Sequence, residues 1–114
     1  MAISELYTGS VSISTTEISL VSGTSTLQND TTDGVFQVFI DFANMAAGDE
    51  YNIYIKEKVT SGGAQRTIYQ AQLEGAQSSP FVTPSLILMH GWDVTVVQIA
   101  GTARTIDWSI RQVA

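Results

Sequence analysis

Alternation of apolar and polar residues is the feature that most constrains how this chain can fold. Between residues 35 and 42, one set of alternating positions carries Phe36, Val38, Ile40 and Phe42. A period of two places successive side chains on opposite faces of a β-strand, whereas a helix needs an apolar stripe of period 3.6. No window of helical length carries such a stripe. The sequence therefore predicts an all-β chain.

The same alternation, divided by turn residues, predicts the other strands. They fall at about residues 11–13, 18–20, 51–58, 65–73, 85–90, 92–99 and 105–111. Gly62-Gly63 predicts a hairpin turn, residues 22–34 an exposed loop, and the proline-containing segment 75–84 a loop or an edge strand. We expect one domain over residues 1–114, an antiparallel β-sandwich or jelly roll of seven to eight short strands.

The strand faces also predict the core. We expect Ser85–His90 to be a buried strand, Met45 to reach the core from the connection 43–49, and Gly48 to adopt a positive φ. The predicted core positions are Phe36, Val38, Ile40, Ile53, Ile55, Val94, Val96, Ile106, Trp108 and Ile110.

The amino-acid composition excludes most kinds of catalytic site. The 114 residues include no cysteine and one histidine. Disulfides, cysteine zinc sites and thiol nucleophiles are therefore excluded, and histidine-rich metal sites are disfavoured. No phosphate-binding loop or other cofactor fingerprint is present, since Gly62-Gly63 lacks a following helix. We expect no enzymatic activity, no cofactor and no metal.

His90 is the one side chain whose ordinary pKa lies near neutrality, so an acid–base mechanism would have to use it. It could pair with Asp93 or Asp107 and with a serine such as Ser85 or Ser109, but no Gly-x-Ser-x-Gly turn presents a nucleophile. A histidine at a strand end, bonded to backbone or lying at a subunit contact, is the preferred interpretation.

The segment 29–34, Asn-Asp-Thr-Thr-Asp-Gly, offers hard oxygen ligands for calcium, chiefly from Asp30 and Asp33. Its spacing does not match an EF-hand loop, and Asp and Asn also form turns without metal. Residues 29–31 fit a glycosylation sequon, but we find no export signal before it. Asp49 and Glu50 are adjacent, and adjacent strand residues point to opposite faces, so they make a poor catalytic pair.

The net charge and the polarity of the chain limit the kinds of partner that it can bind. The net charge is −6, with −7 in residues 1–55 and +1 in the remainder, which opposes binding to nucleic acid or anionic membranes. Ser, Thr, Gln and Asn account for 36 of the 114 residues, so the polar surface is mostly neutral. The longest apolar run, at residues 86–89, is far shorter than a membrane span. We expect a protein made in the cytoplasm without a signal peptide.

Five residues are candidates for partner binding. Val35, Phe39 and Tyr54 are apolar or aromatic residues in excess of what one core face needs, and Lys56 and Lys58 concentrate positive charge in the second half of the chain. An exposed surface formed by Tyr54 and Tyr69 is a further candidate, for a carbohydrate or protein ligand.

The chain resembles the small all-β head decoration (cement) proteins of tailed bacteriophages. The features are the pattern of short Ser/Thr-rich strands, the connection Phe-Ala-Asn-Met-Ala-Ala-Gly-Asp at 42–49, and the ending Asp-Trp-Ser-Ile-Arg-Gln-Val-Ala at 107–114. The resemblance implies a non-enzymatic virion protein that binds the assembled shell of the major capsid protein, often as a homo-oligomer such as a trimer, and stabilises the head. The alternatives are a phage tail or fibre accessory domain and a carbohydrate-binding β-sandwich.

Overall fold

The computed structural model describes residues 2–113, which form nine β-strands. The strands are β1 (Ile3–Ile13), β2 (Ile18–Ser19), β3 (Gly34–Asp41), β4 (Glu50–Lys58), β5 (Gln65–Glu74), β6 (Phe81–Val82), β7 (Leu86–Leu88), β8 (Asp93–Ala100) and β9 (Arg104–Val113). Within the described residues there is no helix long and apolar enough to cross a membrane.

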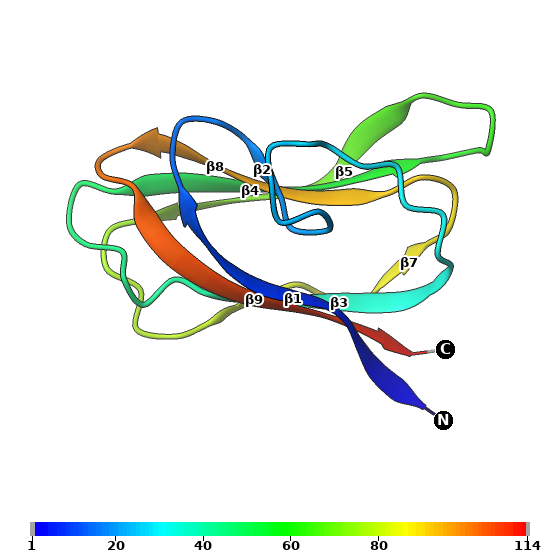
Figure 1. Ribbon diagram of the computed structural model, residues 1–114, viewed down its shortest axis with the longest axis horizontal. Helices are drawn as coiled ribbons and strands as arrows, with labels where there is room; N and C mark the ends of the chain where they lie inside the picture. The colour runs from blue at the N-terminus through cyan, green and yellow to red at the C-terminus, as the bar shows by residue number, and fades with distance from the viewer. Residues whose placement is uncertain (1, 114) are drawn as a thin grey trace.

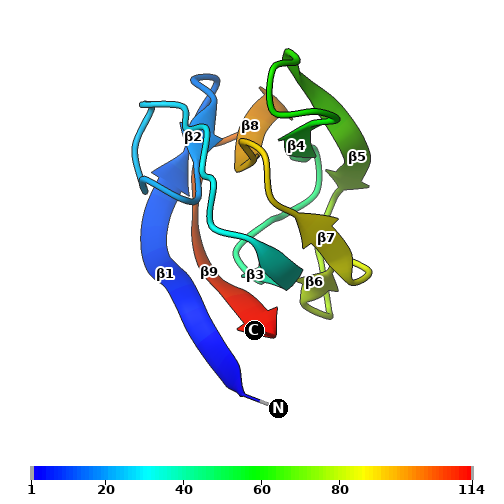
Figure 2. The same cartoon turned by 90° about the vertical axis from the view of Figure 1, so that its right-hand side faces the viewer.

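The strands form two antiparallel sheets packed face to face (Figure 1). Sheet A has the order β1-β9-β3-β6, with β7 also paired to β3, and sheet B has the order β2-β8-β4-β5. Figure 2 shows the sheets as two separate layers with the core between them. The predicted all-β sandwich is confirmed, and the count exceeds seven to eight because of the two-residue β6, which lies in the segment predicted as a loop or an edge strand.

Burial follows the alternation. All ten predicted core residues are buried, and Met45 and Gly48 behave as expected: Met45 is 3% exposed and Gly48 has a φ of 91°. The further buried apolar residues are Ile13, Leu20, Phe42, Tyr51, Leu88 and Trp92. The core therefore draws side chains from both sheets and from the connections between them.

Two sequence predictions about strands were wrong. Segment 85–90 is not a buried strand, because β7 pairs only with β3 and leaves Ile87 77% exposed while Leu88 is buried. The N-terminal half of β1 was not predicted. Its alternation is interrupted between Glu5 and Tyr7, where Leu6 is an extra residue opposite β9.

Bulges also occur elsewhere in the sheets. Ile68 is an extra residue of β5 opposite β4, and a register shift in β8 leaves Ile99 extra. Strands β1 and β5 lie at the edges of their sheets. Each long edge strand therefore contains one bulge.

Trp108 of β9 joins the two layers. Its indole N–H donates a 2.9 Å hydrogen bond to the carbonyl of Leu20, which directly follows β2 of sheet B. The ring covers Gly9, its cross-strand neighbour in β1, and a Cβ on Gly9 would lie 2.7 Å from the ring. Glycine is therefore required there by the closeness of the indole.

We predict that Trp108→Ala lowers the free energy of unfolding by about 3–5 kcal/mol, because the ring is 5% exposed and its loss leaves a cavity and an unpaired carbonyl. Chemical denaturation monitored by circular dichroism measures the change. An unchanged denaturation midpoint would contradict the assigned burial.

We predict that Gly9→Ala is also destabilising, since its methyl group would displace the Trp108 ring. The matched control is Gly62→Ala in the β4–β5 turn, where a Cβ meets nothing within 4 Å. Thermal melting compares the two variants, and equal melting temperatures would show that the Trp108 ring does not restrict residue 9.

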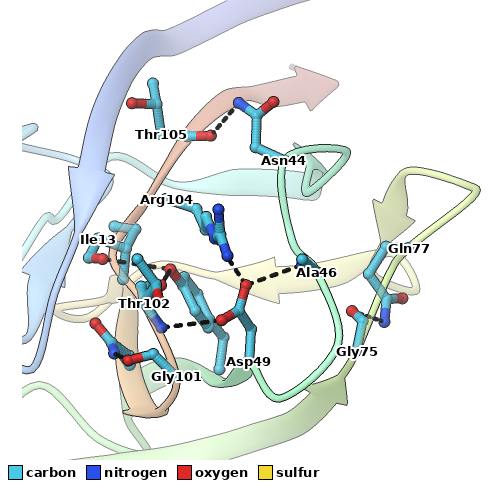
Figure 3. A network of polar contacts seen from close by, with 12 residues as sticks. Ile13, Asn44, Ala46, Asp49, Gly75, Gln77, Gly101, Thr102, Arg104 and Thr105 are labelled. Carbon is cyan, nitrogen blue, oxygen red and sulfur yellow. Dashed lines mark hydrogen bonds and ion pairs between the residues drawn. The ribbon is translucent and has the colours of Figure 1, made fainter.

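Asp49 ties the connection before β4 to the connection before β9 (Figure 3). Its carboxylate accepts hydrogen bonds from the backbone N–H groups of Ala46 and Thr102, at 2.9 Å each, and pairs with Arg104 at 2.8 Å. The two backbone hydrogen bonds, with Arg104 adding to them, hold the pKa of Asp49 below its usual range. A carboxyl group with a lowered pKa stabilises the fold above its ordinary pKa and loses that contribution as the pH falls through the folded-state value.

We predict that Asp49→Asn lowers the melting temperature at neutral pH. The difference between wild type and variant should start to shrink as the pH falls below about 4, the ordinary pKa of an aspartate, and should disappear once the pH passes the lowered folded-state pKa. Melting curves recorded at a series of pH values test this, and a difference that stays constant to low pH would contradict the assigned role of the charge.

Candidate functional site

His90 lies in the connection between β7 and β8, and the structure gives it a backbone role. Its N–H donates to the carboxylate of Glu57, which also accepts a 2.6 Å hydrogen bond from the N–H of Met89. The carboxylate of Asp93 accepts hydrogen bonds from the hydroxyl of Ser19 and from the N–H groups of Gln28 and Val94. These bonds hold the connections in place and do not assemble a catalytic triad around His90.

Burial raises the pKa of Asp93, opposed by the three hydrogen bonds that its carboxylate accepts. Asp93 pairs with Lys56 of β4, so its side chain lies on the outer side of sheet B, the side that faces away from sheet A. It is nevertheless fully buried. The segment that contains Ser19 and Gln28 covers it. Asp93 thus fastens part of the 22–34 loop to sheet B.

The 22–34 loop is exposed only in part. Residues 24–27 are exposed, but Asp30 forms a backbone bridge with Trp92, and the carbonyl of Thr32 accepts the Trp92 indole N–H at 2.8 Å. Asp30 also accepts the hydroxyl of Tyr7 and the N–H of Thr32, which makes the predicted turn. Burial, with Asp30 beside it, raises the pKa of Tyr7 to about 12.

These contacts leave the Asp30 carboxylate engaged by protein donors. Among residues 2–113 there is no group of three His, Asp or Glu side chains placed to hold a metal ion. The turn interpretation of segment 29–34 is therefore the one that the geometry supports.

We predict that excess chelator leaves the melting curve unchanged, while Asp30→Ala lowers the melting temperature because it removes the acceptor of Tyr7 and Thr32. Differential scanning fluorimetry tests both. A marked fall in melting temperature with chelator would restore calcium binding by Asp30 and Asp33.

The outer face of sheet A carries an apolar row across four strands. Ile3 of β1 pairs with Val113 of β9, Val113 with Val35 of β3, and Val35 with Ile87 of β7. Ile3, Val35 and Ile87 are 70%, 37% and 77% exposed. Exposed apolar residues scattered singly are ordinary, but a contiguous row across a sheet marks an interaction surface.

Phe39 and Arg111 form a ridge on this face. The Arg111 guanidinium lies 3.8 Å from the centre of the Phe39 ring, a cation–π contact, and its Nε donates to the hydroxyl of Ser109 at 3.2 Å. A hollow of about 210 Å³ separates this ridge from the apolar row, and another of about 270 Å³ lies toward Asp41 and Asp107. The ridge therefore divides the face into an apolar half and an acidic half.

Asp41 and Asp107 are direct neighbours across β3 and β9, and both are exposed. Like charges directly opposite each other in a sheet are destabilising. Neither takes part in the ion pairs of residues 2–113, which are Lys56–Glu17 and Arg104–Asp49. This end of the face thus carries two carboxylates without a cationic partner.

The outer face of sheet B is different in chemistry. Tyr54 lies on it opposite Gln70, and Asn52 lies opposite Gln72. The Asn52 amide donates to the Tyr54 hydroxyl at 3.0 Å. Tyr69 pairs with the buried Ile55 and faces inward, so the predicted Tyr54–Tyr69 surface does not exist. What remains is one tyrosine with amides on one side and, on the other, a hollow that the Lys56–Glu17 ion pair helps to line.

The two lysines differ in how they are held. Lys56 pairs with Glu17 at 2.8 Å, and Glu17 also accepts the hydroxyl of Thr95. Although burial opposes ionisation, the bonds from Lys56 and Thr95 lower the pKa of Glu17. Lys58 lies against Gly91, where a Cβ would meet its side chain at 3.0 Å. Lys56 is therefore a member of an internal ion pair.

The structure thus separates the five candidate residues. Val35 and Phe39 lie together on the outer face of sheet A, while Tyr54 and Lys56 lie on the outer face of sheet B. Arg111 was missed as a site residue. The alternation of β9 already predicts that Arg111 points outward, but its position next to Phe39 can be recognised only once the β3–β9 register is known.

Comparison of the chain with protein-family models, with curated proteins and with solved structures finds no match in any of the three.

Proposed function

We propose that the protein is a non-enzymatic structural protein of a tailed bacteriophage that binds the assembled capsid shell as a symmetric homo-oligomer and reinforces it. The observation that carries the proposal is the exposed apolar row on sheet A, formed by Ile3, Val113, Val35 and Ile87. Such a surface is buried at low cost against protein. A protein that exposes it permanently on one face is suited to an assembly.

The two outer faces have separate roles in this proposal. The apolar face of sheet A is the one that subunits bury against each other. The outer face of sheet B, with Tyr54, Asn52, Gln70 and Gln72, contacts the shell of the major capsid protein. Its uncharged amides are desolvated with less penalty than charged groups, and each makes hydrogen bonds to a protein surface.

A capsid shell repeats the same binding site many times, and a monomeric receptor does not. Each docking event uses the outer face of sheet B of one copy, so one shell binds many copies. We therefore infer a position on the virion surface.

We predict that the protein co-sediments with shells from its own source and that Gln70→Glu/Gln72→Glu abolishes most of this binding. The two substitutions add charge to the outer face of sheet B, at exposed positions whose side chains the core does not use. The matched control is Ser78→Glu/Ser79→Glu, which adds equal charge at exposed positions between β5 and β6.

Particle pelleting with quantification of bound protein is the measurement. Binding by the control and not by the sheet B variant supports the proposal. A wild-type protein that never pellets with these shells would overturn shell binding and favour the tail or fibre alternative.

Carbohydrate binding is the second candidate, because Tyr54 lies among Asn52, Gln70 and Gln72 on one face. A sugar stacks on an aromatic ring while amides bond to its hydroxyl groups. Calorimetric titration with host surface polysaccharide distinguishes the two. Saturable binding that is lost in Tyr54→Ala would favour the sugar-binding function.

A further inference from the structure

We propose that the outer face of sheet A is covered by the same face of a second copy of this chain, related by a twofold axis that sets Arg111 of each copy against Asp107 of the other. This deepens the proposed function by naming the occupant of the apolar face. It also assigns a twofold pairing where the resemblance implied a trimer.

The outer face of sheet A exposes apolar side chains that a bound partner would cover. Ile3, Ile87 and Val82 are 70%, 77% and 42% exposed on this face, and Phe39 beside Val82 is only half-buried. The body measures 40 Å along its longest axis, which is horizontal in Figure 1 and follows the strands, and 20 Å along its shortest. A face of this length and width is large enough for a standard interface, in which each partner buries roughly 800 Å².

The charges on the face favour a second copy as the occupant. Arg111 lies on the ridge beside both hollows, opposite Glu5 of β1, and Asp107 and Asp41 lie in the acidic half. Arg111 and Asp107 both belong to β9, four residues apart, with Ser109 between them; the Ser109 hydroxyl donates to the Glu5 carboxylate. A twofold contact joins one patch to itself, so a patch with a cation and a carboxylate on either side of its centre is self-complementary in one orientation.

Two orientations of stacked sheets can be compared. If the strands of both copies ran parallel, Asp41 and Asp107 of both would gather at one end, four carboxylates without a cation. If the strands run antiparallel, with the axis across the strands at Ser109 and Phe39, each Arg111 lies over the partner's acidic end. Phe39 and Val82 then meet their own copies at the centre. Electrostatics therefore selects the antiparallel arrangement.

A charge-reversal experiment tests this pairing. The variants are Arg111→Asp, Asp107→Arg, and the double variant that carries both changes, each measured by sedimentation equilibrium of the full chain. The proposal requires the wild type to be dimeric and each single variant to associate about tenfold more weakly, because like charges then face each other.

Mixing the two single variants shows whether the weaker association comes from this interface or from a nonspecific effect of the substitutions. In an equimolar mixture of the two single variants, the aspartate introduced at position 111 of one copy faces the arginine introduced at position 107 of the other. At the opposite end, the unchanged Asp107 faces the unchanged Arg111, so association should recover. The double variant should recover it as well. Residues 107 and 111 are exposed, and far-UV circular dichroism spectra that match the wild type, with cooperative melting, confirm that the variants fold.

A substitution at residue 87 tests the same interface without changing Arg111 or Asp107. Ile87→Glu changes a side chain that is 77% exposed, and it should also weaken dimerisation, because the added carboxylate lies on the half of the face that meets the acidic half of the other copy. A monomeric or trimeric wild type, or single variants that dimerise as well as the wild type, would overturn the proposal. A dimer that fails to pellet with shells would overturn only the capsid function, and a pelleting monomer only this interface.

Discussion

The contact between Trp108 and its surroundings is the interaction on which the arrangement of the two layers depends. The indole is buried, it lies directly over Gly9 in the neighbouring strand, and it donates to the carbonyl of Leu20 on the other layer. One side chain thus aligns β1 with β9 and fastens the end of β2 to them. Because this contact faces the core, the opposite side of β9 is left to present Arg111 and Asp107 on the outer face of sheet A.

Buried polar side chains hold the connections between strands, which the apolar core does not fix. Asp49, Glu57 and Asp93 are buried carboxylates, and each accepts hydrogen bonds from backbone N–H groups of a connection distant in sequence. A buried carboxylate is costly unless such donors surround it. The connections are therefore held by specific bonds, which explains why a chain with few charges keeps these three inside.

The fold class and most of the core could be predicted because alternation is a local property, and strands such as β3, β4 and β9 keep it without interruption. β1 was obscured because Leu6 breaks the period, and β7 because a short apolar run looks the same whether one side or both sides are covered. The faces depend on register between distant strands. Val35 and Phe39 could be identified as outward, but their meeting with Arg111 and Ile87 could not.

The bulges in β1 and β5 bear on how the protein associates. Both strands lie at sheet edges, where a regular row of free N–H and C=O groups would accept a strand from another molecule and extend the sheet without limit. The extra residues Leu6 and Ile68 break that row in the first half of each strand and increase the local twist. Growth into open-ended fibrils through the edges is thereby disfavoured. In the dimer that we propose, association uses the broad faces, where a twofold contact closes after two copies.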